Sequence, residues 1–199
     1  MNKQDILTKL VTLGIPSPLI QAISLVDREQ FVPHNVRLYA YEDTALPIEH
    51  GMTLPPVSIV AKMLTLTELA DNQKILEIGS GSGYVLALIA KAYPGTECFG
   101  LEINARVAFS TVKRLENYKN IHLFAKSGFN GFSEQAPFDR IIVSAAAENT
   151  ETLLLLRPQL IEGGIIIAPV GDKLIHIRRT EHSHRITEHP GTTFVPLVK

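Results

Sequence analysis

The chain has 199 residues, of which 45% are apolar and 20% are charged, and its formal net charge is −1. This length suffices for one domain with a sizeable core, and the composition excludes wholesale disorder, while the balanced charge without a basic block argues against a nucleic-acid partner. The apolar runs are too short to span a bilayer, the first residues lack the apolar core of a signal peptide, and the single cysteine, Cys98, cannot form an internal disulfide. We therefore expect a cytoplasmic monomer without a membrane partner.

The N-terminal part combines helices with a long irregular segment. Apolar residues at helical spacing predict a helix over residues 5–14, which Gly14 can end, and a second helix over residues 16–26. Residues 27–56 hold turn residues, aromatics and prolines with little periodicity, so we expect a long ordered loop with one short helix. Helical spacing returns over residues 57–69. Loops of this length inside compact domains are often functional.

Strands and helices alternate from residue 74 onward. The apolar pattern predicts strands over 74–79, 97–103, 121–127, 138–147 and 163–171, and helices over 83–93, 105–118 and 150–160. Pro158 is expected to disturb the last turn of the third of these helices. Residues 173–180 and 192–198 are expected to be closing strands with no helix between them.

Near-continuous apolar strands that alternate with helices are typical of a mostly parallel sheet covered on both faces. We therefore predict one α/β domain over residues 1–199, with a mostly parallel sheet, antiparallel C-terminal strands and helices on both faces. Residues 74–199 are expected to form its core. Residues 1–73 are expected to form a helical extension that carries the long loop.

The stretch ILEIGSGSGY, residues 75–84, places three glycines directly after an apolar strand. A Walker loop requires Lys-Ser/Thr after its last glycine, and Tyr84 stands there instead. The dinucleotide fingerprint requires its third glycine one place beyond Gly83. Glu102, at the end of the next predicted strand, suits the two hydroxyls of a ribose. The pattern favours a nucleoside site over a glycine-rich turn that binds nothing.

This combination resembles class I S-adenosylmethionine-dependent methyltransferases, which share a Rossmann-like domain. Further stretches occur in a fixed order, namely REQFVP, AYEDTALPI, ILEIGSGSGY, APFDRIIVSAAA, GGIIIAPVG and FVPL. Together they closely resemble the protein-L-isoaspartate O-methyltransferase family over nearly the whole chain. The resemblance implies S-adenosyl-L-methionine as cofactor and damaged proteins or peptides with isoaspartyl residues as substrates. Their carboxylate is already ionised at neutral pH, so the reaction needs no general base.

The resemblance also implies the residues of the site. The cofactor site would comprise Glu77, Gly79, Ser80, Gly81, Gly83, Glu102 and Ile103, with Ser127 and Gly128 near the adenine. The substrate would contact His50, Met52, Leu54, Pro55 and Ala145, and the residues with a catalytic hydroxyl would be Thr53 and Ser58.

Three positions depart from the family pattern. The family loop reads Gly-Gln-Thr-Ile-Ser, whereas this chain has Met52 in place of the glutamine and Pro55 in place of the active-site serine. Ser58 can replace that serine, or it can be a first-turn residue of the following helix. Ser127 stands where the family has an acid that accepts a hydrogen bond from the adenine amino group. Two alternatives follow, namely a related methyltransferase with a changed substrate and a cofactor-binding protein without catalysis.

Three histidines near the end of the chain lie in HSHRITEH, residues 182–189. The spacing of His182, His184 and His189 suits no standard zinc pattern. We expect a solvated hairpin turn here and no metal site.

Overall fold

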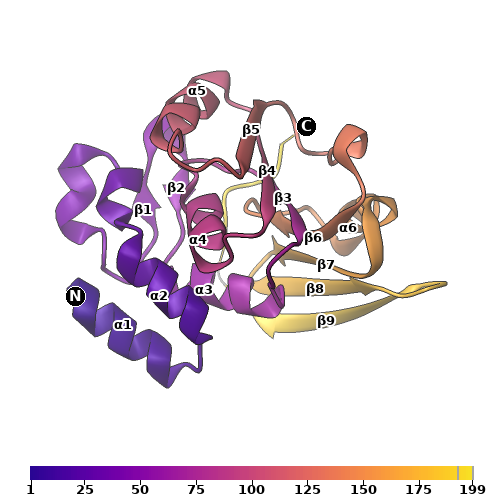
Figure 1. Cartoon of the computed structure of the whole chain (residues 1–199), viewed down its shortest axis with the longest axis horizontal. Coiled ribbons are helices and arrows are strands. Elements are labelled where there is room, and N and C mark those ends of the chain that lie inside the picture. Colours follow the sequence, from indigo (N-terminus) through magenta and orange to yellow (C-terminus); the bar gives the residue numbers. More distant parts are fainter. Residues whose placement is uncertain (192, 199) are drawn as a thin grey trace.

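A computed structural model describes residues 1–191 and 193–198 (Figure 1). Its centre is a seven-stranded sheet with the order β5-β4-β3-β6-β7-β8-β9. The strands are β3 (Lys74–Ile78), β4 (Glu97–Glu102), β5 (Ile121–Ala125), β6 (Phe138–Val143), β7 (Leu160–Val170), β8 (Lys173–Arg179) and β9 (His184–Pro190). Neighbours from β5 to β7 pair in parallel, and β8 and β9 continue the sheet antiparallel. The predicted α/β fold with antiparallel C-terminal strands is confirmed.

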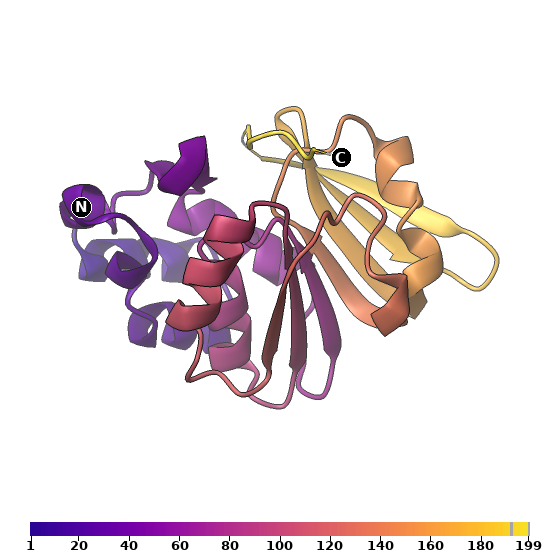
Figure 2. The ribbon, with the colours of Figure 1, turned by 90° about the horizontal axis from the view of Figure 1, so that it is seen from above.

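Helices cover both faces of the sheet (Figure 2). One face packs on α4 (Tyr84–Ala92), α5 (Ala105–Arg114) and the N-terminal helices α1 (Lys3–Thr12), α2 (Ser17–Leu25) and α3 (Val57–Leu66). The other face packs on α6 (Thr150–Leu154), which ends before a 3-10 turn at Arg157–Gln159, where Pro158 was expected to interrupt the helix. Each face has its own cluster of buried apolar side chains, because the parallel strands are apolar on both sides.

The segment before α3 has more regular structure than the sequence suggested. It contains three 3-10 helices, at Arg28–Phe31, His34–Tyr39 and Glu49–Gly51, instead of the one short helix that we expected. It also contains a two-stranded antiparallel ladder of β1 (Leu46–Pro47) and β2 (Thr53–Leu54). Strands of two residues carry no detectable alternation, so the sequence could not reveal this ladder.

The last strand lies earlier than predicted. β9 is formed by the histidine-containing stretch, which pairs with β8 from Arg179↔His184 to Lys173↔Pro190. The expected hairpin turn is shorter and precedes it, so only His182 of the three histidines lies in the turn. β9 is an edge strand whose residues are mostly exposed, and such a strand needs no apolar face. The strand predicted over 192–198 is wrong, since Pro196 makes only an isolated bridge to Ala146, and Thr192 lies outside the described residues.

The chain changes direction across the sheet between β3 and β6. From β3 it proceeds through β4 to β5 on one side, and then returns to place β6 and β7 on the other side. Such a reversal leaves a crevice at the carboxyl ends of the two central strands, which is where open α/β sheets bind their ligands. The glycine turn follows β3 and Ser144 follows β6 at this point.

Candidate active site

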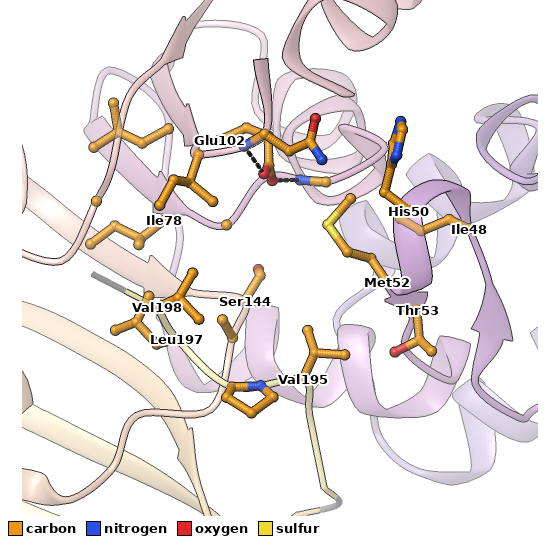
Figure 3. Close-up of a pocket in the computed structure, with 18 of the residues that line it drawn as sticks. Ile48, His50, Met52, Thr53, Ile78, Glu102, Ser144, Val195, Leu197 and Val198 are labelled. Atoms are coloured by element: carbon orange, nitrogen blue, oxygen red, sulfur yellow. Dashed lines mark hydrogen bonds between the residues drawn. The ribbon is translucent and has the colours of Figure 1, made fainter. Parts of the chain in front are cut away.

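A cavity of about 270 Å³ lies at the carboxyl ends of β3, β4 and β6. Figure 3 shows Glu102, Ile78 and Ser144 on the sheet side of this cavity and His50, Met52 and Thr53 on the opposite side. The chain tail, residues 195–198, closes a third side. The tail is held there because Ala146 donates to the carbonyl of Val195 and accepts from the N–H of Leu197, both at 2.7 Å. Three separate parts of the chain thus enclose one hollow.

The glycine turn after β3 forms the floor of the cavity. Gly79 and Gly81 have φ values of 79° and 48°, which favour glycine. The backbone N–H groups of Gly79 and Ser80 donate to the carbonyl of Leu101, and the Thr111 hydroxyl donates to the carbonyl of Gly81 at 2.7 Å. A Cβ at either glycine would meet another side chain at 3.5 Å, which is ordinary van der Waals contact. The turn is therefore well packed, while its backbone stays open on the cavity side.

Gly83 has a different role from its two neighbours. It caps α4 with a φ of 83°, and a Cβ there would stand 2.7 Å from side-chain atoms of Thr111 on α5 and of Leu115 directly after this helix. It is not among the residues that line the cavity. The structure therefore gives this glycine a packing role between helices, and its predicted contact with the cofactor stays a prediction.

Glu102 is fixed at the end of β4 and is only 2% exposed. Its Oε2 accepts from the N–H of Gly81 at 2.9 Å, and its Oε1 accepts from the N–H of Asn104 at 2.8 Å (Figure 3). A carboxylate has about four lone-pair positions, so two remain for other donors. Because the side chain lines the cavity, it can receive two hydroxyl groups from a ribose.

Glu77 is more deeply buried, at 1% exposure. Its Oε1 lies 2.7 Å from the Ser144 hydroxyl, and its Oε2 has no hydrogen-bond partner among the described residues. Burial raises the pKa of Glu77 to about 8, the hydroxyls of Ser144 and Ser80 oppose this shift, and the nearby charge of Glu102 adds to it. Glu77 faces a recess of about 30 Å³ under the loop, next to the main cavity, which Leu54, Pro55 and Ser80 also line.

The loop over the cavity is shaped by β1 and β2. His50 and Gly51 take φ values of 58° and 75° in the tight connection between these strands. Behind the loop, the fully buried Arg28 donates from Nη2 to the carbonyl of Pro55 at 2.6 Å. Its guanidinium lies 5.0 Å from the ring centre of Tyr84, the first residue of α4. Arg28 thus fixes the loop to the helix that follows the glycine turn.

Most of the residues proposed from the sequence meet at this place. The main cavity is lined by His50, Met52, Thr53, Gly79, Gly81, Glu102, Ile103, Gly128 and Ala145. The recess beside it is lined by Leu54, Pro55, Glu77 and Ser80, together with Thr53, Gly79 and Gly81.

Besides Gly83, two proposed residues line neither the main cavity nor the recess. The N–H of Ser58 donates to Oδ1 of Asp43 at 2.9 Å, and Ser58 lines a separate hollow with Leu13 and Ile15. This placement fits the first-turn reading of Ser58 better than a hydroxyl at the site. Ser127 is half-buried and its Oγ accepts weakly from the N–H of Phe129, while its neighbour Gly128 lines the cavity.

Sequence reasoning missed several lining residues. They are Ile48, Gly51, Ile78, Leu101, Asn104, Ser144 and residues 195–198. Asn104 and Ser144 had a detectable signal, since both follow the carboxyl end of a parallel strand, where ligands bind. Residues 195–198 had no such signal, because their position depends on tertiary contacts with Ala146.

Two further features bear on the class of protein. Within residues 1–191 and 193–198, no group of three or more His, Cys, Asp and Glu side chains is arranged to hold a metal ion. None of the helices in these ranges has the length and apolarity needed to cross a membrane.

A sheet of this order, with a glycine turn after its first strand and a buried acid ending the second, defines a class I S-adenosylmethionine-dependent methyltransferase. The family model for protein-L-isoaspartate(D-aspartate) O-methyltransferase matches residues 1–199. The chain belongs to this family.

Similar sequences agree with this assignment, and similar solved structures agree with the fold. A protein-L-isoaspartate O-methyltransferase of Methanothrix thermoacetophila is 35% identical over 205 residues, covering 100% of this chain and 95% of that protein. One from Shewanella sp. (strain ANA-3) is 39% identical over 198 residues, covering 96% and 91%. A solved structure from Plasmodium falciparum, described as a protein-L-isoaspartate O-methyltransferase in complex with S-adenosyl-L-homocysteine, has a TM-score of 0.84 at 22% identity and covers 100% of this chain and 99% of that chain. Another solved protein-L-isoaspartate O-methyltransferase has a TM-score of 0.86 at 21% identity and covers 100% and 66%.

Proposed function

We propose that this enzyme transfers the methyl group of S-adenosylmethionine to the side-chain carboxylate of isoaspartyl residues in proteins or peptides. The observation that carries the proposal is the single cavity that reaches from Glu102 on β4 to Thr53 on the loop. A nucleoside and an acceptor group can occupy the two ends of this cavity. Family membership over residues 1–199 supports the same substrate class.

The residues present fit the cofactor. When bound, S-adenosylmethionine supplies an electrophilic methyl group on a sulfonium and carries no phosphate. Glu102 would hold the ribose hydroxyls, and the turn at Gly79 and Gly81 would allow close approach to the backbone. Gly128 and Ile103 line the same cavity and would contact the adenine. Ser127 next to Gly128 would offer a neutral acceptor where the family has an acid, which weakens that contact by about 1 kcal/mol.

The methyl transfer depends mainly on the correct placement of the acceptor carboxylate. The acceptor carboxylate is ionised at neutral pH and needs no base. The chain's task is to hold its oxygen in line with the bond to be broken and to exclude water. Met52 and Thr53 on the loop and Val195 on the tail face the cavity and would surround the acceptor.

A related methyltransferase with a different acceptor is the second candidate. Met52 and Pro55 favour it, because they replace two residues of the family loop with apolar ones. Both line the site region, Met52 in the cavity and Pro55 in the recess. The change therefore falls where an acceptor would lie, and leaves Glu102 untouched.

Transfer of a labelled methyl group to a short isoaspartyl peptide tests the proposal. The aspartyl version of the same peptide is the control, and binding of S-adenosylhomocysteine is measured in parallel. Transfer to the isoaspartyl peptide alone is expected. Cofactor binding without such transfer would favour the changed acceptor or a catalytically silent protein.

The proposal also covers the oligomeric state of the enzyme and its cellular compartment. We take it to act as a monomer in the cytoplasm. The single Cys98 is buried, and burial raises the pKa of its thiol to about 12, so it stays neutral and unreactive. Size-exclusion chromatography with light scattering measures the oligomeric state directly.

A further inference from the structure

The loss of the family serine at position 55 raises the question of which hydroxyl group serves the transfer site. Pro55 lines the recess and brings no hydroxyl, and Ser58 lies in a separate hollow. Of the residues that line both the main cavity and the recess, two carry hydroxyls, namely Thr53 and Ser144. They approach the shared space from opposite sides, Thr53 from the loop and Ser144 from the sheet (Figure 3).

Ser144 is held far more firmly than Thr53. It follows β6 directly, and its N–H donates to the carbonyl of Ile78 at 2.8 Å, which ties it to β3. Its Oγ lies 2.7 Å from Oε1 of Glu77. Thr53 is exposed on the two-residue strand β2. A group that must orient a small acceptor is best placed on a rigid element.

We propose that Ser144 is the hydroxyl that holds the methyl-accepting carboxylate and that Glu77 positions it. This assignment rests on the proposed isoaspartyl activity. In it, the Ser144 hydroxyl donates to one oxygen of the substrate carboxylate, while the other oxygen attacks the methyl group. The serine forms no covalent bond and its proton stays in place, so the reaction remains a direct displacement.

The state of Glu77 decides in which direction Ser144 donates. An ionised Glu77 accepts a hydrogen bond from the Ser144 hydroxyl. Only the lone pairs of the serine oxygen then face the cavity, and they would repel a carboxylate. A protonated Glu77 donates to Oγ, and the serine proton is free to point into the cavity. Glu77 is almost fully buried and its Oε2 is unpaired, so the ionised form would be costly.

The surroundings of Glu77 favour the protonated form. The titratable groups around it are Glu102 and Cys98 on β4 and Tyr84 on α4, and the Ser80 hydroxyl in the glycine turn also borders the recess. None of these is a cation. Arg28 lies behind Tyr84, with its guanidinium 5.0 Å from the ring centre, and is not among the residues that line the recess. Burial accordingly raises the pKa of Glu77 to about 8, so the carboxyl keeps its proton at neutral pH.

The test compares serine variants of the full chain at saturating S-adenosylmethionine, with an isoaspartyl peptide as acceptor. Ser144→Ala is expected to lower kcat/KM by about 10- to 100-fold, as for one charge-assisted hydrogen bond. Ser144→Thr keeps a hydroxyl and should retain most of the activity. Ser24→Ala removes a half-buried, hydrogen-bonded hydroxyl on α2 and is the matched control with wild-type rates. The dissociation constant of S-adenosylhomocysteine should change less than about twofold in Ser144→Ala.

The positioning role of Glu77 has its own readout. The wild-type rate should fall as the pH rises through about 8, and this falling limb should vanish in Glu77→Gln, whose amide cannot ionise. A Ser144→Ala enzyme with wild-type kcat/KM, or one whose loss appears only in cofactor affinity, overturns this assignment alone. Absence of transfer by the wild-type protein, with S-adenosylhomocysteine still bound, overturns the proposed activity and this assignment together.

Discussion

The protonation of Glu77 can be tested without any catalysis, through the pH dependence of folding. Glu77→Gln replaces the buried carboxyl with a neutral group of nearly the same shape. In the folded protein burial raises the pKa of Glu77 from 4.5 to about 8, whereas in the unfolded chain the group is solvated. Between these two values the unfolded chain releases the proton and the folded protein keeps it.

The sign follows from this difference in bound protons. The folded state binds more protons in the window, so the free energy of unfolding of the wild type falls as the pH rises. The stabilisation is complete below pH 4.5 and is lost as the pH rises through about 8. One proton changes the free energy of unfolding by at most about 1.4 kcal/mol per pH unit, hence by about 2 kcal/mol between about pH 6 and about pH 7.5.

Urea unfolding of cofactor-free wild type and Glu77→Gln at these two pH values measures the effect. The variant should gain about 2 kcal/mol relative to the wild type at the higher pH. Glu116→Gln removes the same charge from an exposed position and should show no such gain. Parallel pH profiles for wild type and Glu77→Gln would refute the argument, because they would mean that Glu77 is already ionised in the folded protein.

Three other substitutions test the remaining parts of the site. Glu102→Gln turns one acceptor oxygen into a donor that faces backbone N–H groups, so S-adenosylhomocysteine should bind at least about tenfold more weakly by calorimetry; unchanged affinity would contradict the ribose assignment. Gly83→Ala should destabilise the protein by about 2–4 kcal/mol in urea unfolding, since its Cβ would stand 2.7 Å from the side chains of Thr111 and Leu115, whereas Gly14→Ala, with nothing within 4 Å, should cost only about 1 kcal/mol. Pro55→Ser restores the family hydroxyl beside the backbone carbonyl held by Arg28, and transfer to an isoaspartyl peptide should rise several-fold; no gain over a wild type that itself shows no isoaspartyl transfer would favour a changed acceptor.

The sheet could be predicted because its strands are buried on both faces and read as apolar runs. Such apolar runs predicted the strands β3, β4, β6 and β7. β9 could not be found in the same way, since it lies at the edge and its side chains are mostly exposed. Residues 193–198 gave a false signal, because their apolar residues line the cavity and the recess and make only an isolated bridge to Ala146 instead of a strand.

The positions of Glu102 and the glycine turn beside the cavity were predictable for a similar reason. Glu102 and the glycine turn are local features of strand ends, and a motif can record them. The partnership of Glu77 with Ser144 is not local, since the two residues are 67 positions apart and meet only because β3 and β6 are neighbours. Both segments could be predicted from the sequence, but no sequence signal showed that the side chains of Glu77 and Ser144 are in contact.

The division of the site between two parts of the chain bears on how this protein could have changed its acceptor. The turn at Gly81 and the acid Glu102 belong to the sheet, where their hydrogen bonds also hold strand ends together. The loop with Met52 and Pro55 belongs to the N-terminal extension, and Arg28 fixes it through a backbone carbonyl that any residue supplies. Substitution in the loop therefore leaves the sheet and the hydrogen bonds of Glu102 in place. Two of the three departures from the family pattern, Met52 and Pro55, lie in this loop, and the third, Ser127, lies next to Gly128 on the cofactor side. We infer that the loop tolerates substitution, and that acceptor choice can change while Glu102 and the glycine turn stay the same.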